Sequence, residues 1–174
     1  MLEKDLILQP DLNLDGPFLR RTAVRAVVEA DGRCLMVFSA VNGDFKFPGG
    51  GVEAGESHAD ALRREMREEC GRRLSRVGPR IARLTEFDAA AEADKTYFRM
   101  DSHYYRCELG AGAEQALALD AYEADLGFAP EWTTVRNALE ANRAVLQGGR
   151  PPRWTARETF FLQYLADGAP ADPH

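Results

Sequence analysis

Apolar segments separated by short turns make up the first regular part of this chain. The stretch TAVRAVVEA, residues 22–30, is apolar at most positions and predicts a buried strand. Asp31 and Gly32 form a hairpin turn signal, and RCLMVFS, residues 33–39, has the composition of the returning strand. A further turn leads to a short FKF strand, which ends at Pro48 because proline cannot donate to a strand ladder. This part of the chain therefore predicts a sheet built around a hairpin.

A helix with one narrow apolar stripe is predicted over residues 57–70. Ser57 offers the N-cap, and Gly71 stands where a glycine commonly ends a helix in the left-handed conformation. At about 100° per residue, four apolar side chains share one side of this helix. They are Ala59, Leu62, Met66 and Cys70. The stripe indicates that the helix covers a sheet along that side.

The same helix carries Glu65, Glu68 and Glu69 together on one flank of the apolar stripe. Arg63 and Arg67 fall on the other flank, so acids and bases are predicted to be segregated rather than paired. Like charges at these spacings each cost about 0.2–0.5 kcal/mol in an isolated helix. A divalent cation reverses that cost, because Mg²⁺ prefers oxygen ligands. The three glutamates alone leave two alternatives open, a cation site and a solvated acidic face.

The remaining pattern predicts further strands and two more helices. Residues 77–88 and 95–109 indicate an antiparallel pair around an acidic, alanine-rich loop. Residues 127–135 indicate a strand, and a helix is expected over 136–147. A capping box at 155–158 is expected to start the last helix. Strands thus mix with three helices, which predicts the α/β class, with a mixed sheet covered by helices.

A glycine turn, PGGG at residues 48–51, stands directly before the acidic helix. Glycines let the backbone approach a ligand closely and leave its carbonyl and amide groups free to point inward. A loop that leads into a helix start in this way can receive phosphate oxygens or offer a carbonyl to a metal ion. The turn favours a cation and phosphate site, because a solvated acidic face does not explain it.

Length, composition and charge limit the class of protein and of partner. The chain has 174 residues, of which 45% are apolar and 29% are charged, which fits one globular domain over 1–174. Within it we expect an N-terminal extension at 1–16 and a flexible tail at 167–174. The formal net charge of -6 argues against a nucleic acid duplex as partner. A small anionic substrate remains compatible if a metal ion or a local basic pocket receives it.

Hydropathy and cysteine usage predict a cytoplasmic protein. No apolar stretch has the length to cross a bilayer, and the N-terminus lacks the pattern of a secretory signal. Cys34, Cys70 and Cys107 match neither a disulfide framework nor a zinc site, so we expect buried, reduced thiols and no membrane partner. A homodimer is left open, because the first sixteen residues could either pair with a second chain or cover a sheet edge.

The window around the glycine turn and the acidic helix resembles the box of the Nudix hydrolase family. Eight residues carry the match at the family's spacing. They are Gly50, Glu56, Arg64, Glu65, Met66, Glu68, Glu69 and Gly71. The departure is Arg72, where the family usually has an apolar residue. The FKFPGG approach and a later E-x-W strand are also similar to Nudix proteins, and three outer stretches resemble a bacterial subgroup without a settled substrate.

The resemblance implies the Nudix fold, an α/β/α sandwich with a mixed β-sheet, and a pyrophosphohydrolase activity. The implied reaction is Mg²⁺-dependent or Mn²⁺-dependent hydrolysis of a nucleoside diphosphate linked to another moiety X. By position, Glu68 and Glu69 are the expected main metal ligands, and Glu65 is a further ligand or the base. A backbone carbonyl of Gly49 or Gly50 is expected to complete the metal shell. The rival implication is a nucleotide-sensing module that keeps the fold with little catalysis.

The resemblance also implies supporting roles around the box. Arg64 is expected to act with the catalytic glutamates and to brace the loop through an ion pair with Glu56. Substrate contacts are expected from Gly50, Gly51, Glu56 and Arg25. Outside the box, Glu123 is the first candidate for a further catalytic carboxylate. The competing carboxylates are Glu86, Asp88, Glu92 and Asp94.

The histidines and most of the aromatic residues are expected to have structural rather than catalytic roles. His58 is expected to be exposed, His103 to be a hydrogen-bonded strand residue, and His174 to lie in the tail. Four aromatic residues are expected near the cleft. They are Tyr97, Phe98, Tyr104 and Tyr105. Since alternate strand residues face opposite sides, at most half of them could stack on a base, and core packing is the preferred interpretation.

Overall fold

The computed structural model describes residues 1–168, which form two sheets and four helices. The strands are β1 (Leu2–Ile7), β2 (Phe18–Val27), β3 (Glu29–Ala30), β4 (Arg33–Ser39), β5 (Phe45–Lys46), β6 (Leu74–Ala89), β7 (Tyr97–Leu109) and β8 (Phe128–Thr133). The helices are α1 (His58–Cys70), α2 (Ala121–Asp125), α3 (Val135–Gln147) and α4 (Arg153–Ala166).

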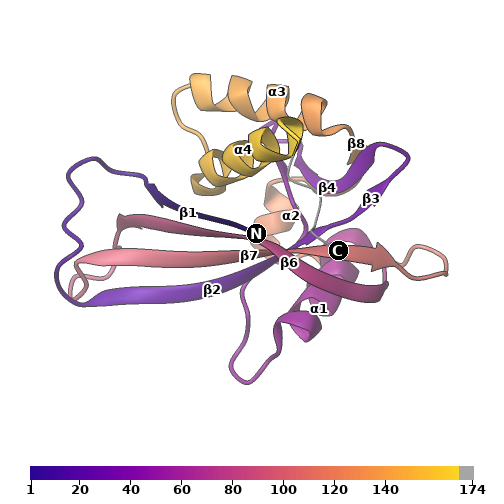
Figure 1. Ribbon diagram of the computed structural model, residues 1–174, viewed down its shortest axis with the longest axis horizontal. Coiled ribbons are helices and arrows are strands. Elements are labelled where there is room, and N and C mark those ends of the chain that lie inside the picture. The colour runs from indigo at the N-terminus through magenta and orange to yellow at the C-terminus, as the bar shows by residue number, and fades with distance from the viewer. Residues whose placement is uncertain (169–174) are drawn as a thin grey trace.

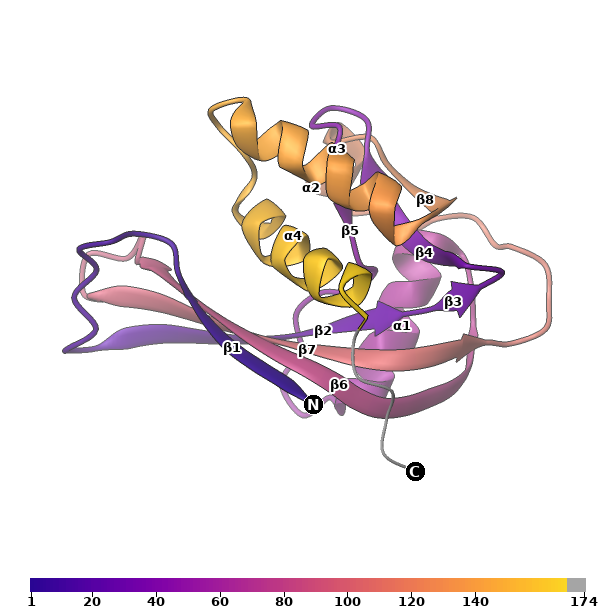
Figure 2. The same cartoon turned by 45° about the horizontal axis from the view of Figure 1, so that its top comes forward.

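The strands lie between α1 on one side and α3 with α4 on the other (Figure 1, Figure 2). On the α1 side, Leu62 and Met66 join a buried cluster with Val24 of β2. On the opposite side, Phe161 of α4 joins a second buried cluster with Leu84 of β6. Burial of apolar side chains on both faces stabilises the layers. The predicted α/β/α sandwich is therefore confirmed.

The longer sheet has the strand order β1, β6, β7, β2. β1 pairs in parallel with β6, and β2 pairs in parallel with β7, whereas β6 and β7 are antiparallel. This arrangement confirms the predicted mixed sheet. β1 lies within the predicted extension at 1–16, and in this structure it adds a strand to the sheet edge. Alternation along β2 directs Val24 toward α1 and leaves Arg25 on the α4 side.

The smaller sheet holds the predicted hairpin. β4 pairs with β3 and β5 and also with β8, in each case antiparallel. The turn between β3 and β4 has positive φ at both Asp31 (50°) and Gly32 (72°), which matches the twist of a tight hairpin. This sheet carries the short strand that leads into the glycine turn.

The start of α4 differs from the prediction. The helix begins at Arg153, before the expected capping box. Thr155 donates its hydroxyl to Asp44 at 2.8 Å, and Glu158 accepts the Phe47 amide at 3.3 Å. Both side chains therefore make tertiary contacts and do not cap the helix. The sequence pattern also fails to predict α2, because its five residues are too few to show a helical period.

The glycine turn lies along the free edge of β2. The Val24 amide donates to the Gly50 carbonyl at 3.0 Å, and the Val52 amide donates to the Thr22 carbonyl at 2.9 Å. Gly49 adopts φ 139°, and a Cβ there would lie 2.0 Å from the Val24 carbonyl oxygen. Only glycine fits this position, because the backbone of β2 is too close for a side chain.

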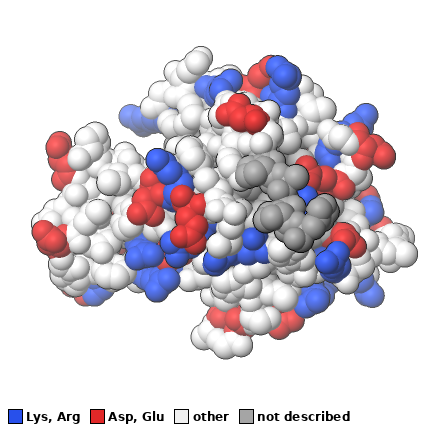
Figure 3. Space-filling model, viewed as in Figure 1, with Lys and Arg blue, Asp and Glu red and all other residues white. Residues whose placement is uncertain are grey.

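On the face drawn in Figure 3, Lys and Arg side chains are interspersed with Asp and Glu side chains. That face therefore carries no broad basic surface of the kind that binds nucleic acid phosphates. Within residues 1–168, none of the helices combines the length and the apolar character needed to cross a bilayer. The three cysteines are free and buried, as predicted.

Candidate active site

Local signals place the acidic helix as predicted. The Ser57 side chain accepts the Asp60 amide at the helix start, and Gly71 ends the helix at φ 61°. The three glutamates differ in burial. Glu69 is fully buried and Glu65 is nearly so, whereas the Glu68 side chain is 38% exposed. The helix thus presents one carboxylate to solvent and two to the interior beside the glycine turn.

Glu69 connects α1 to β5 and to the glycine turn. One carboxylate oxygen accepts the Lys46 ammonium at 2.5 Å, and the other accepts the Gly49 amide at 2.7 Å. The Lys46 Nζ also lies 4.4 Å from the centre of the Phe128 ring, which is a cation–π contact. Both oxygens of this buried carboxylate are therefore hydrogen-bonded.

Glu65 lies against Gly50. A Cβ on Gly50 would be 2.4 Å from a Glu65 carboxylate oxygen, so the side chain needs glycine beside it. Arg64 donates to the same carboxylate at 2.6 Å. Burial, followed by the charges of Glu69 and Glu68, nevertheless raises the pKa of Glu65 above its usual value. Glu65 therefore holds a proton more readily than an isolated glutamate.

Arg64 braces the loop against the helix. Its Nε and Nη2 atoms donate to the two oxygens of Glu56, each at 2.9 Å, and Nη2 also reaches the Gly51 carbonyl at 2.9 Å. Hydrogen bonds from Arg64 hold the pKa of Glu56 below its usual range. The predicted pair between Glu56 and Arg64 is present.

The predicted segregation of acids from arginines on α1 is wrong in one respect. Arg64 contacts Glu65 at 2.6 Å and Glu68 at 3.4 Å. Although Arg64 projects from another side of the helix, its long side chain and forked guanidinium reach across to the acidic flank. One arginine thus partly neutralises two of the three glutamates.

The Gly49 carbonyl, one of the two expected metal ligands of the turn, accepts a hydrogen bond from the Arg25 guanidinium. Arg25 is buried, and its Nε has no hydrogen-bond partner among the described residues. The Gly50 carbonyl is committed to the Val24 amide. Of the two carbonyls, only that of Gly49 lies outside the strand ladder.

Glu123 lies in α2, where it forms a capping box with Asp120. Burial raises the pKa of Glu123, and the charge of Glu69 adds to this rise. Among the competing carboxylates, Glu86 pairs with Arg157 at 2.5 Å and Asp94 pairs with Lys95 at 2.6 Å. These two competing carboxylates are therefore each paired with a cationic side chain.

These groups suit a divalent cation in chemical type. Among residues 1–168, no three His, Cys, Asp or Glu side chains converge in a metal-binding arrangement. The carboxylates instead contact the cationic side chains Lys46 and Arg64, and Arg25 contacts the Gly49 carbonyl. Four box carboxylates face those two cationic partners, so negative charge is in excess. The carboxylates are Glu56, Glu65, Glu68 and Glu69. The donor set fits Mg²⁺ or Mn²⁺, provided that Lys46 and Arg25 give way.

A cavity of about 430 Å³ lies on the α4 side of the sheet. Arg25 lines it and contacts the Gly49 carbonyl, and Tyr122, next to Glu123, also lines it. Its apolar surface includes Phe98, Met100, Tyr122 and Trp154. An open depression of about 730 Å³ lies on the α1 side, lined by Gly51, Glu56, Arg64 and Glu65. The glycine turn thus lines the depression directly and is connected to the cavity through Arg25.

The sequence did not predict Tyr122 and Trp154 as cavity residues, because strand and helix periodicity cannot show that two distant segments meet. Of the aromatic residues expected near the cleft, Phe98 lines the cavity. Tyr104 is fully buried in the apolar cluster that also contains Phe161 of α4, and Tyr97 stacks on Phe18 with ring centres 4.8 Å apart. Core packing therefore accounts for part of the set, as predicted.

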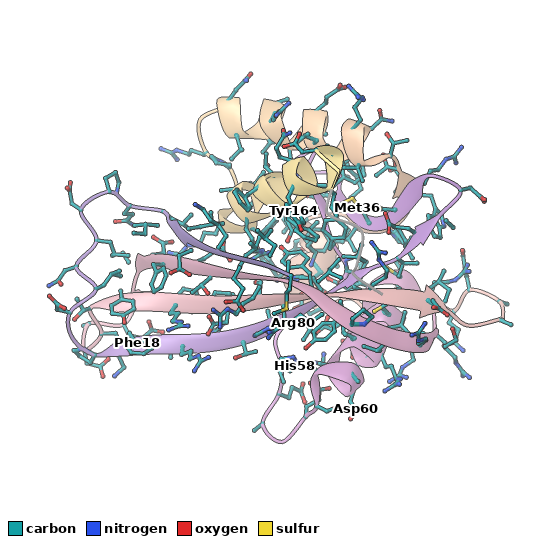
Figure 4. All side chains as sticks on the ribbon, in the orientation of Figure 1. Phe18, Met36, His58, Asp60, Arg80 and Tyr164 are labelled. Atoms are coloured by element: carbon teal, nitrogen blue, oxygen red, sulfur yellow. The ribbon has the colours of Figure 1, made fainter. Side chains whose placement is uncertain are left out.

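The two described histidines meet on the α1 side of the sheet. Figure 4 shows His58 on α1 close to Arg80 of β6. His58 is half-buried rather than exposed, because its Nδ1 lies 2.8 Å from the Tyr105 hydroxyl and its ring centre 4.8 Å from that of His103. His103 is a buried strand residue bonded to Arg80, as predicted. Residue His174 lies outside the described residues.

Comparisons with known proteins agree with this geometry. The sequence model of the NUDIX domain matches residues 19–152. The nucleoside triphosphatase NudI of Salmonella agona (strain SL483) is 43% identical over 60 residues, which cover 32% of this chain and 43% of NudI. NudI from Salmonella arizonae matches to the same extent. The chain therefore spans less than half the length of the curated relatives it matches.

Solved structures share the fold. A NUDIX hydrolase from Nitrosomonas europaea has a TM-score of 0.56 and 19% sequence identity, and the match covers 84% of this chain and 90% of that one. The E. coli ORF135 protein has a TM-score of 0.51 and 24% identity, with coverage of 90% and 100%. Together with the domain match, these findings show that the chain belongs to the Nudix hydrolase family.

Proposed function

We propose that this protein hydrolyses a pyrophosphate bond in a nucleoside diphosphate linked to another moiety X, with Mg²⁺ or Mn²⁺ as cofactor. The observation that carries the proposal is the gathering of Glu65 and Glu69 against the glycine turn, with excess negative charge beside the open depression that Glu56 and Glu65 line. The rival, a sensing module with little catalysis, predicts loss of box carboxylates, and all of them are present.

The residues that would hold the cation are Glu68, Glu69 and the carbonyl of Gly49, with Glu65 as a further ligand or as the base. When bound, the ion supplies charge neutralisation for the pyrophosphate and activation of water. Arg64 keeps Glu56 and the loop in place, so that the carboxylates and the glycine backbone stay at a fixed separation. Gly50 and Gly51 let a phosphate chain approach the backbone closely.

Proton removal is assigned to Glu65, with Glu123 as the second candidate. The pKa of each is raised, Glu65 by burial and the charge of Glu69, and Glu123 by burial. A general base works best when its pKa approaches the working pH, which favours these two carboxylates over an ordinary exposed glutamate. Arg25, at the border between the turn and the cavity, is assigned to bind a phosphate oxygen.

The cavity on the α4 side is assigned to the base or to the X group. Its volume of about 430 Å³ lies in the range of small-molecule sites, and aromatic residues form part of its wall. A nucleotide is favoured because the partial match at 43% identity is to nucleoside triphosphatases. As a further proposal, the protein acts in the cytoplasm, where its three buried thiols stay reduced.

A hydrolysis screen tests the function. Purified wild-type protein is incubated with Mg²⁺ and a set of nucleoside triphosphates, dinucleoside polyphosphates, sugar nucleotides and ADP-ribose, and the nucleotide products of cleavage are separated and measured. Glu68→Gln serves as the blank, because Glu68 is partly exposed and its replacement leaves the core intact. Mg²⁺-dependent cleavage by the wild type alone supports the proposal. No cleavage of any compound, or equal cleavage by both proteins, contradicts it.

A further inference from the structure

The lysine of the FKFPGG stretch has an unusual position. Phe45 and Phe47 point into the buried cluster under α4, so Lys46 between them must face the opposite side. On that side it meets Glu69 and the face of Phe128. Lys46 is only 9% exposed. A lysine is rarely buried to this degree unless it is paired, so its charge has a specific partner.

That partner is an expected ligand of the divalent ion. Lys46 Nζ lies 2.5 Å from Glu69 Oε1, in a space where the expected cation and the ammonium compete for one carboxylate. Arg25 has the same relation to another expected ligand, because it donates to the Gly49 carbonyl. In this structure, positively charged side chains of the chain itself therefore hold Glu69 and the Gly49 carbonyl.

We propose that Lys46 is a positioning residue that occupies the cation position at Glu69 until a divalent ion displaces it, so that Lys46 limits the affinity for the ion. This inference rests on the proposed function. Without a positive partner, a buried Glu69 would be an uncompensated charge, which is strongly unfavourable in a protein interior. Lys46 therefore supplies the buried partner that orients Glu69 in the ion-free protein.

Lys46 can exchange with a divalent ion at Glu69 because of the length and flexibility of its side chain. An ammonium on a flexible four-carbon stem can swing away without disturbing the backbone. An incoming phosphate chain offers a destination for the displaced ammonium. Metal binding and release of Lys46 are thus coupled, and the coupling lowers the apparent affinity for the ion by the work of displacing the lysine.

Calorimetric titration with Mn²⁺ alone, in the absence of substrate, tests the proposal. Lys46→Met keeps the length and the contact with Phe128 but removes the charge. We expect it to bind Mn²⁺ about tenfold more tightly than the wild type, because the competing charge next to Glu69 is gone. The matched control is Lys95→Met, which removes a half-buried lysine paired with the exposed Asp94, and should leave the affinity unchanged.

The direction of the change separates the alternatives. If Lys46 only holds Glu69 in place for the ion, Lys46→Met weakens Mn²⁺ binding, and this result, or an unchanged affinity, overturns the inference. Lys46→Gln gives the same comparison with a side chain that still hydrogen bonds to Glu69, in case Lys46→Met does not fold without the ion. Failure of the proposed function has a different signature, in which the wild type itself binds no Mn²⁺.

Discussion

Two buried groups of charged residues lie on opposite sides of β5, and they differ in how far their charges are satisfied. The first, the core cluster, consists of Arg157, Glu86, Glu158 and Tyr104. Arg157 is 2% exposed and donates to Glu86 at 2.5 Å and to Glu158 at 2.8 Å. The Phe47 amide and the Tyr104 hydroxyl complete the bonding of Glu158. Every carboxylate of this cluster has a buried donor fixed by the fold.

The second group, the site cluster, consists of Glu56, Glu65, Glu68 and Glu69 with Lys46 and Arg64. Its carboxylates outnumber its cationic side chains, and one of them, Glu68, is partly exposed. The pKa of Glu65 is raised by burial and by the neighbouring carboxylates even though Arg64 donates to it. The difference shows that burial of charged side chains does not by itself mark a functional site. An excess of negative charge beside a solvent-accessible depression is the feature that marks it.

Replacement of Glu69 should have the largest effect on activity. Glu69→Gln keeps the shape of the side chain but removes the charge that the ion needs, so we expect turnover to fall by about 10³-fold, equivalent to roughly 4 kcal/mol. Glu140→Gln, at an exposed position of α3, is the matched control and should retain wild-type turnover. Steady-state rates on any substrate found by the screen provide the measurement. Wild-type rates for Glu69→Gln would remove the site cluster from the mechanism.

Arg157→Met tests the core cluster. It leaves Glu86 and Glu158 buried without their shared partner, so the free energy of unfolding should fall by about 3–5 kcal/mol. Arg153→Met removes an exposed arginine that contacts Asp88 at 3.2 Å, and should cost less than about 1 kcal/mol. Denaturant unfolding of both variants gives the comparison. Equal losses for the two would show that the buried network is no more important than a surface pair.

Gly50→Ala sharpens the description of the site cluster. The added methyl group meets the Glu65 carboxylate, which is the flexible end of a side chain, so the fold should persist while Glu65 moves. We expect turnover to fall by about tenfold, equivalent to roughly 1.4 kcal/mol. Gly110→Ala is the control, because it lies outside the site cluster and the nearest atoms are 3.5–3.8 Å from its Cβ position, which is ordinary van der Waals contact. Circular dichroism and rates are measured for both, and an equal effect in the two would contradict the contact.

The paired histidines should give the smallest effect, through pH. Burial, the nearby His58 and Arg80 lower the pKa of His103 to about 4. Folding thus favours the neutral imidazole of His103. Its contribution to the free energy of unfolding is fully present above the unfolded pKa of about 6.5, and it is lost as the pH falls toward 4. We expect a loss of about 1 kcal/mol between pH 7 and pH 5, measured by denaturant unfolding. His103→Gln should reduce that slope, and an unaltered slope would exclude His103 as the cause.

Local patterns predicted the acidic helix. Ser57 and Gly71 cap α1 as expected, because capping depends on neighbours within one helical turn. Helical periodicity predicted only that the three glutamates share one flank. The ion pair of Glu56 with Arg64 was expected from the resemblance to the Nudix box, and the structure contains it.

The sequence pattern could not predict the contacts between segments that are distant along the chain. Trp154 reaches the cavity because its indole donates to Asp44, 110 residues earlier in the chain. Lys46 reads as an ordinary polar residue of a short strand until the structure places Glu69 and Phe128 around it. The capping box at Thr155 was misread for the same reason, since its hydroxyl bonds to Asp44. Tertiary hydrogen bonds, which periodicity cannot reveal, decide all three.

The most direct test of the cation site is the unfolding temperature as a function of Mg²⁺ concentration, for the wild type and for Glu69→Gln. A ligand that binds only the folded state adds about 2.7 kcal/mol of stability at a hundred times its dissociation constant. The wild type should therefore unfold at progressively higher temperature as Mg²⁺ is added, while Glu69→Gln should respond little. Equal rises in both proteins, or no rise in the wild type, would contradict a divalent cation held by the carboxylates of α1.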